Sequence, residues 1–395
     1  MIDTNLLLII ALILFSTKIL AIFMRRIHLP QVVGALMAGL LLGPALFNLI
    51  EPNETISAIA EFGVILLLFS AGMETDFKQL RSSFKVSLLV SLLGVTAALG
   101  GGFALAMLFG KSSFESFFIG IIIASMSTSI TVEALQEMGM LKTRSGTAIM
   151  GASLLDDIFV IIILAVAMGV GTSGFEPASI AMILVKIAAF FVFAIISGIL
   201  VNKLFNFVYD KLGISRRLSI FAIAYCFIMA YLAEQFGLAD ITGAYIAGIA
   251  FCNTRCVEYL ETKTHTLSQL FFTPIFLANI GIHTSFDGMT GSLVIFTALF
   301  VFVAILTKFA GCGLGAKICK YSNQESLQIA TGMVARGEVS FIVASKGIAA
   351  AYISSLLYPS IIVVVLVTVL ITPVLLKFLF ASKDNNPAAG IAGIE

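Results

Sequence analysis

Charged residues are scarce in this sequence. Asp, Glu, Lys and Arg make up 11% of the 395 residues, whereas hydrophobic residues make up 59%. Soluble domains contain about one quarter charged and about one half apolar residues. This deficit of charge excludes a water-soluble globular protein. The net charge of +1 gives no indication of a nucleic-acid-binding surface or of an acidic disordered tail.

Cysteines are also few, and their number, five, is odd. All five lie within or beside apolar segments, and Cys252 and Cys256 lack a second pair at the spacing of a zinc site. We therefore interpret the cysteines as small buried hydrophobic residues. We expect no bound cofactor.

Apolar segments long enough to cross a bilayer, which takes about 20 residues, are abundant. In the first, residues 5–24, Asp3 precedes the apolar stretch and Arg25 follows it, which is the reverse of a signal peptide and predicts a retained helix. Hydropathy predicts an all-α membrane protein with thirteen transmembrane spans, near residues 5–24, 31–50, 57–74, 84–109, 114–138, 144–170, 177–205, 216–235, 240–254, 265–285, 291–318, 325–350 and 356–381.

The positions of the basic residues test this number of spans, because cytoplasmic connections carry the excess of Lys and Arg. If every second connection is cytoplasmic, these connections and the C-terminal tail collect seventeen of the 23 basic residues, and only Lys111 is left outside. The N-terminus is then predicted outside and the C-terminus in the cytoplasm. The connections are too short for a soluble domain, and the short polar tail after residue 382 predicts no attached nucleotide-sensing domain.

The other five basic residues fall within predicted spans: Lys18, Lys186, Lys308, Arg336 and Lys346. A charge at mid-depth costs about 2.5 to 3.5 kcal/mol and therefore marks a functional candidate, unless its side chain reaches the interface. Lys18 and Lys346 lie close enough to the ends of their spans to do so.

Two adjacent carboxylates have no such route, because Asp156 and Asp157 lie about 18 Å from the inner end of their span at 1.5 Å per residue. Their side chains diverge by about 100° around a helix, so one can face an ion pathway while the other meets a helix. Lys308 lies at a comparable depth and is the natural counter-charge. A static salt bridge would use only one of the two carboxylates, so we predict a site for sodium and protons at these three residues.

Two spans carry runs at mid-depth that predict broken helices. One run contains Ser125, Ser127, Thr128, Ser129 and Thr131, and the other is residues 332–338, with the sequence GMVARGE. Unwound backbone in a membrane is tolerated only where it lines a cavity or is buried in protein. One broken span in each half, in opposite orientations, predicts inverted repeats around a site at the midplane.

The ends of broken helices carry partial charges, positive at N-termini and negative at C-termini. Arg336 and Glu338 lie in the second run and can neutralise such ends. Glu133 lies just beyond the first run. It either compensates a helix end, attracts cations, or serves only in packing or solvation.

Several motifs resemble those of the monovalent cation:proton antiporter superfamily. Residues 29–34 (LPQVVG) with 39–44 (GLLLGP) resemble its opening signature, and residues 61–64 (EFGV) with 69–74 (FSAGME) resemble the next. Further matches are residues 243–248 (GAYIAG) and 274–276 (PIF) through Gly281, so the resemblance spans nearly the whole chain. The Asp156-Asp157 pair with Lys308 is most similar to the electrogenic NapA-type sodium/proton antiporters.

This resemblance implies an NhaA-like fold with two crossed broken helices, in a homodimer located in the cell membrane. It implies a dimerisation panel formed by residues 1–78 and 206–290, a linker helix at 177–205, and a core that moves like an elevator, formed by 79–176 and 291–382. Residues 383–395 would be a short cytoplasmic tail.

The resemblance also implies individual roles. Asp157 would bind the cation or the proton, and Asp156 would pair with Lys308. Thr128 and its neighbours Ser127, Ser129 and Thr131 would lie beside the ion, and Arg336 with Glu338 would support the second broken helix.

Sodium/proton exchange, with lithium as a further substrate, is the predicted function, and the expected partners are the bilayer, these ions and a second copy of the chain. A potassium/proton antiporter or potassium efflux system on the same scaffold is the first alternative. A sodium-coupled symporter of an organic solute is the second, although it would need a larger cavity. A membrane sensor that transports nothing would leave the buried charges unexplained.

Overall fold

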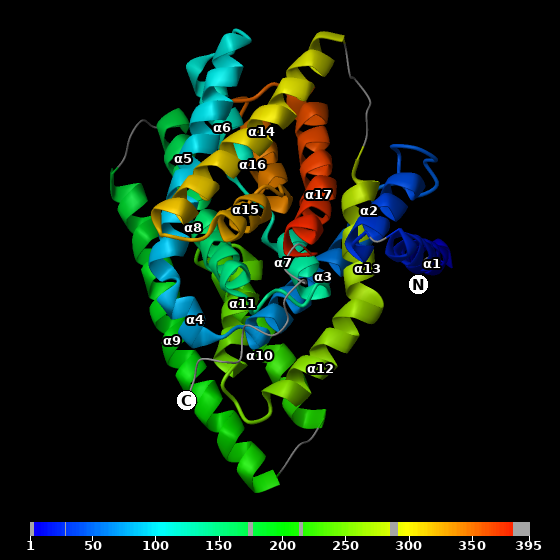
Figure 1. Ribbon diagram of the computed structural model, residues 1–395, viewed down its shortest axis with the longest axis vertical. Helices are drawn as coiled ribbons and strands as arrows, with labels where there is room; N and C mark the ends of the chain where they lie inside the picture. Colours follow the sequence, from blue (N-terminus) through cyan, green and yellow to red (C-terminus); the bar gives the residue numbers. More distant parts are fainter. Residues whose placement is uncertain (1–3, 28, 173–176, 213–215, 285–290, 382–395) are drawn as a thin grey trace.

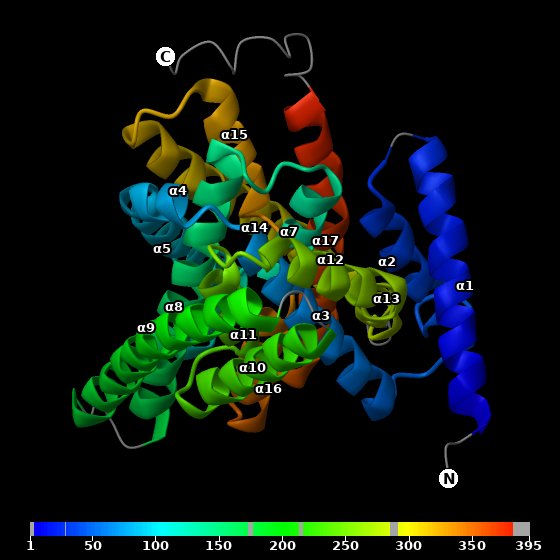
Figure 2. The same ribbon diagram turned by 90° about the horizontal axis from the view of Figure 1, so that it is seen from below.

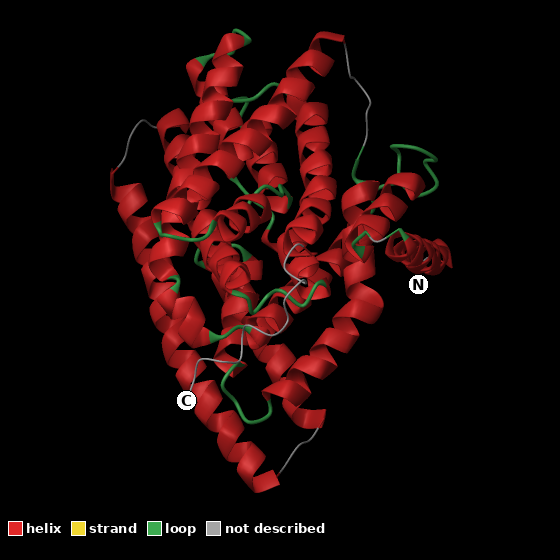
Figure 3. Cartoon of the chain, viewed as in Figure 1, coloured by secondary structure: helices red, strands yellow, loops and turns green. Residues whose placement is uncertain are grey.

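The computed structural model describes residues 4–27, 29–172, 177–212, 216–284 and 291–381, and these residues form helices and no strands (Figures 1 and 3). The helical elements are α1 (Thr4–Arg26), α2 (Gln31–Leu42), α3 (Glu54–Glu74), α4 (Phe77–Ser82), α5 (Phe84–Leu108), α6 (Ser113–Ala124), α7 (Thr128–Glu137), α8 (Arg144–Thr172), α9 (Pro177–Leu212), α10 (Arg216–Gln235), α11 (Asp240–Phe251), α12 (Val257–Leu267), the π-helical turn η1 (Ser268–Phe272), α13 (Thr273–Ile282), α14 (Gly291–Ile318), α15 (Asn323–Gly332), α16 (Glu338–Ala349), the 3-10 turn η2 (Ser355–Leu357) and α17 (Tyr358–Ala381).

Every predicted span overlaps a helix or a run of consecutive helices. Within the described residues, nine helical stretches are long and apolar enough to cross a membrane, and α2, α11 and most of α16 are shorter apolar helices. The predicted span 265–285 comprises the end of α12, the turn η1 and α13. The chain is thus an integral membrane protein built of helices.

One predicted span was too long, because residues 31–50 do not form a single helix. The helix α2 ends at Leu42, and Pro44, which cannot continue a helix, follows two residues later. The chain then folds back, so that the backbone N–H of Ile50 donates to the carbonyl of Leu42 at 2.8 Å. Apolar composition alone did not reveal this turn.

Polar side chains fix the starts of several helices by accepting hydrogen bonds from backbone N–H groups that have no partner within the helix. Asn53 accepts from Thr55 N at 2.8 Å at the start of α3, and Ser112 accepts from Glu115 N at 3.2 Å at the start of α6. At α15, Ser322 and Glu325 form a reciprocal capping box.

The helices pack in two groups. In one, α3 packs against α11 and α13, while α2 packs against α1 and α13; in the other, α5 packs against α6, α8 and α14. The helices α1 and α9 lie at opposite edges of the molecule in both views (Figures 1 and 2). Only 17% of the most apolar window of each is buried, whereas the corresponding window in Ser113–Glu137 is entirely buried. The broken span therefore lies at the centre, and α1 and α9 present apolar surface to lipid.

The packing repeats within the chain. The pairs α1 with α2, α5 with α6, and α5 with α8 recur as α10 with α11, α14 with α15, and α14 with α17. Corresponding helices are seven predicted spans apart. Because seven is odd, they cross the membrane in opposite directions, which is the property of inverted repeats.

Candidate functional site

The two predicted breaks are present, although both are shorter than the polar runs that predicted them. The first consists of residues 125–127 between α6 and α7, and the second of residues 333–337 between α15 and α16. Thr128, Ser129 and Thr131 were predicted in the break but lie in the first turns of α7. Small hydroxyl side chains are tolerated at the start of a helix, so a polar run does not by itself fix where the helix resumes.

The two breaks cross and satisfy each other's backbone. The N–H of Ser127 donates to the carbonyl of Ala335 at 2.8 Å. The hydroxyl of Thr131 donates to the carbonyl of Gly332 at 2.8 Å, and the hydroxyls of Ser125 and Ser340 lie 2.7 Å apart. Since no water is needed to complete these bonds, unwound backbone is accommodated at the centre of the protein.

Gly337 is required at this crossing for space. A Cβ atom at this position would collide with the side chain of Ser127. The backbone φ of Gly337 is −164°, an extended conformation that other residues also adopt. The glycine therefore permits close approach of the two breaks.

Asp156 is completely buried against the opposite repeat. Its two carboxylate oxygens accept from Lys308 Nζ at 2.7 and 2.8 Å, and Lys308 is also fully buried. The hydroxyl of Ser91, on α5, donates to the same carboxylate at 3.3 Å. The ion pair therefore joins α8 to α14 in a region from which water is excluded.

Asp157 is turned toward the first break. Its side chain is 2% exposed, and the hydroxyl of Thr128 lies 3.5 Å from Oδ2. The two adjacent aspartates thus address different neighbours, as expected from their angular separation on a helix. Together with the hydroxyls of α7, they supply oxygen atoms, the ligands that hard cations prefer. Among the described residues, no group of three or more His, Cys, Asp or Glu side chains could hold a metal ion.

A positively charged side chain lies at the C-terminal end of the first half of each broken span. Besides Asp156, Lys308 donates to the carbonyl of Ala124, the last residue of α6, at 2.6 Å. Arg336, fully buried, donates to the carbonyls of Met333 at 3.3 Å and Val334 at 2.9 Å, just after α15. Both cations therefore compensate the partial negative charge of a helix C-terminus.

The remaining predicted residues lie outside this cluster or outside the described atoms. Glu338 is the first residue of α16, and its side chain is not among the described residues. Glu133 is buried, but its carboxylate accepts from Gln269 Nε2 at 3.0 and 3.1 Å. It therefore faces η1 and does not meet Lys308.

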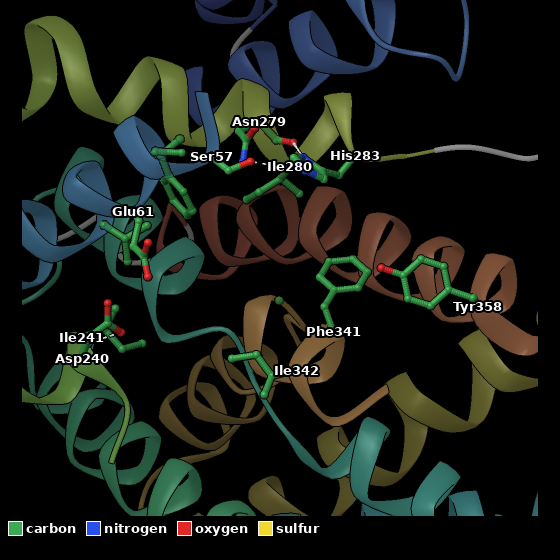
Figure 4. A pocket seen from close by; sticks show the side chains of 14 residues that line it. Ser57, Glu61, Asp240, Ile241, Asn279, Ile280, His283, Phe341, Ile342 and Tyr358 are labelled. Atoms are coloured by element: carbon green, nitrogen blue, oxygen red, sulfur yellow. Dashed lines mark hydrogen bonds between the residues drawn. The ribbon is translucent and has the colours of Figure 1, made fainter. Parts of the chain in front are cut away.

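A cavity of about 380 Å³ opens between α3, α11 and α13 on one side and α16 and α17 on the other, and it reaches Gly337 at the second break. Figure 4 shows Glu61 and Asp240 at one end of it and Phe341 and Tyr358 at the other. The sequence analysis assigned no role to Glu61 or Asp240. Asp240 is the first residue of the predicted span 240–254 and Glu61 is the fifth of 57–74, so both lie near span ends. The cost of a charge at mid-depth, which marked Asp156, therefore does not single them out.

Comparison with known proteins agrees with this geometry. Residues 10–382 match the family described as "Sodium/hydrogen exchanger, transmembrane". The chain belongs to this family. The chain is 36% identical to the Na(+)/H(+)-K(+) antiporter GerN of Bacillus cereus over 376 residues, which cover 95% of this chain and 96% of GerN.

The chain is also 33% identical to the Na(+)/H(+) antiporter of Enterococcus hirae, over 94% of this chain and 97% of that protein. The structure of the sodium proton antiporter MjNhaP1 from Methanocaldococcus jannaschii superimposes with a TM-score of 0.68 at 18% identity and covers 94% of this chain and 95% of that one. The predicted superfamily and helical fold are thereby confirmed, and the chain is a transporter.

Proposed function

We propose that this protein moves sodium, and also lithium, across the membrane in exchange for protons, with Asp157 as the residue that binds either the cation or the proton. The observation that carries the proposal is the position of Asp157. Its carboxylate is buried at the crossing of the two breaks, beside Thr128, while Lys308 is held by Asp156. Ionised, Asp157 gives a cation an oxygen ligand; protonated, it carries the proton.

The second part of the proposal is the movement. The helices α5 to α8 and α14 to α17 would form the core, and α1 to α3 with α10 to α13 would form a dimerisation panel in a homodimer. The long helix α9 would join them. The core would slide past the panel like an elevator, with the cavity of Figure 4 as the access route from outside. The positions of Lys and Arg support a cytoplasmic C-terminus and an external N-terminus.

Potassium is a second candidate cation, because GerN, whose sequence covers nearly all of this chain, is named for both sodium and potassium. The decisive measurement is proton movement, reported by a pH-sensitive dye, in liposomes that contain the purified protein. Each alkali cation is added in turn. Proton release on addition of sodium or lithium supports the proposal, release with potassium alone selects the alternative, and no release with any alkali cation contradicts both.

Sodium and protons should compete for Asp157, because one carboxylate cannot hold a proton and act as a full anionic ligand. The sodium Kd should therefore rise as the pH falls, by up to about tenfold per pH unit within the titration range of the site. Calorimetric titration of the detergent-purified protein at a series of pH values measures this. A sodium Kd that stays constant across the series would contradict a shared site.

A further inference from the structure

The C-terminal half of α7 contacts three other elements through polar side chains. Glu133 accepts from Gln269 of η1 at 3.0 and 3.1 Å. Gln136 donates to Glu74 at the end of α3. Glu137 accepts from the backbone N–H of Gln31 at 2.7 Å and of Val32 at 3.2 Å. One helix of ten residues therefore holds α2, α3 and η1 together.

These contacts lie at the opposite end of the site from the cavity. The helix α3 contributes Glu61 to the cavity and Glu74 to the contacts with α7, about 20 Å apart at 1.5 Å per residue. Similarly, Phe276 and His283 of the α13 region line the cavity, whereas Gln269 lies before that helix. Gly337, in the second break, lines the cavity, whereas Glu133, Gln136 and Glu137 lie in the second half of α7, beyond the first break.

Two of the three contacts have chemistry that makes them more than packing. The carboxylate of Glu137 lies at the N-terminus of α2, where the first backbone N–H groups and the helix dipole favour an anion. Glu133 is only 5% exposed, so its carboxylate needs the amide of Gln269. Gln269 lies in a π-helical turn, a feature frequently found at functional sites.

We propose that these three contacts form a latch, defined by Glu133, Gln136 and Glu137 on α7 and by Gln269, Glu74 and the start of α2 opposite. The latch closes the far side of the site while the cavity is open. It rests on the proposed function, in which α7 moves relative to α2, α3 and η1, since this movement requires all three contacts to break. The latch therefore stabilises the state in which the cavity is open.

The test measures how often the cavity is open, independently of transport. Ile342 lines the cavity and is 49% exposed, so a cysteine there (Ile342→Cys) reports opening through its rate of reaction with a membrane-impermeant maleimide. The parent chain without this cysteine gives the background of the five native thiols. The latch variant carries Glu137→Gln and Gln269→Leu.

We expect the latch variant to lower the labelling rate about fivefold, because losing the contacts shifts the population toward the state with a closed cavity. Glu137→Gln alone should lower it about twofold, which keeps the test available if the double variant fails to fold. If a folded latch variant is labelled at Ile342→Cys as fast as the chain that carries Ile342→Cys alone, the proposal is overturned.

A matched control changes the same residue types within the group of helices that would move together. Gln324 donates to the carbonyl of Leu379, and Glu325 accepts from Ser322 N at the start of α15. Gln324→Leu with Glu325→Gln should leave the labelling rate unchanged, and an equal fall in the control would show general destabilisation and reject the latch. Labelling requires no ion flux, so absence of sodium-driven proton movement in the parent would contradict the exchange proposal alone.

Discussion

Asp157→Asn should reduce sodium-driven proton flux to the background of empty liposomes. Asparagine has nearly the same shape as aspartate, but its amide can neither release a proton nor give sodium an ionised oxygen ligand. The protein should still fold, because a neutral amide is easier to bury than a carboxylate. Dye-monitored exchange in liposomes measures the loss, and size-exclusion chromatography with a thermal melt checks the fold.

Asp156→Asn is the neighbouring control for this prediction. Its side chain contacts Lys308 and Ser91, so this change weakens an ion pair and leaves Thr128 and Asp157 in place. We expect a reduced but measurable flux. If folded Asp157→Asn protein exchanges sodium for protons at a substantial rate, Asp157 does not carry the transported ion.

Lys308→Gln should lower the free energy of unfolding by about 3 to 5 kcal/mol, because removing one partner of a buried ion pair leaves the other charge uncompensated. The change also removes the hydrogen bond that Lys308 donates to the carbonyl of Ala124. A thermal melt in detergent measures it. Lys186→Gln, which removes an exposed lysine from α9, should leave the melting temperature unchanged.

Lys308→Gln also tests whether transport is electrogenic. Sodium at Asp157 would draw Asp156 away from Lys308 and leave a buried charge uncompensated. We predict that more than one proton leaves per sodium, so that the exchange moves net charge and the flux responds to membrane potential at about 2.3 kcal/mol per net charge per 100 mV. Exchange with and without a potassium/valinomycin potential should show this response in the wild type and a weaker one in Lys308→Gln. If the exchange rate of the wild type does not respond to the potential, the role of Lys308 is structural only.

Hydropathy and loop charge were sufficient to predict the helical spans, because every backbone group in lipid must be satisfied within a helix. The end of α2 was not predicted, since a turn such as residues 43–50 can be as apolar as a helix. The positions of the breaks were predicted only to within several residues. Where α7 resumes depends on the contact of Ser127 with Ala335, which is far away in the sequence.

The charges of the candidate site and the pairing of Asp156 with Lys308 could be predicted from the sequence, whereas several neutral partners could not. Depth in a span singled out Asp156, Asp157 and Lys308, because burial of charge is costly wherever it occurs. Ser340 was not found, since serines are common in membrane helices and only the crossing brings it to Ser125. Gln269 was not found either, because it carries no charge. It lies in a π-helical turn that no sequence pattern predicted, and there it donates to Glu133.

The crossing of the two breaks also constrains how the protein is made. Thr131 bonds to Gly332, which is 201 residues later in the chain. At about 5 to 20 residues per second, the ribosome needs about 10 to 40 s to deliver that partner. During this interval the first broken helix has polar backbone at membrane depth without its native contacts. Folding of the first broken helix is therefore completed only when the second half inserts. Slowing synthesis between α9 and α14 should prolong this interval and make nascent chains more sensitive to membrane proteases.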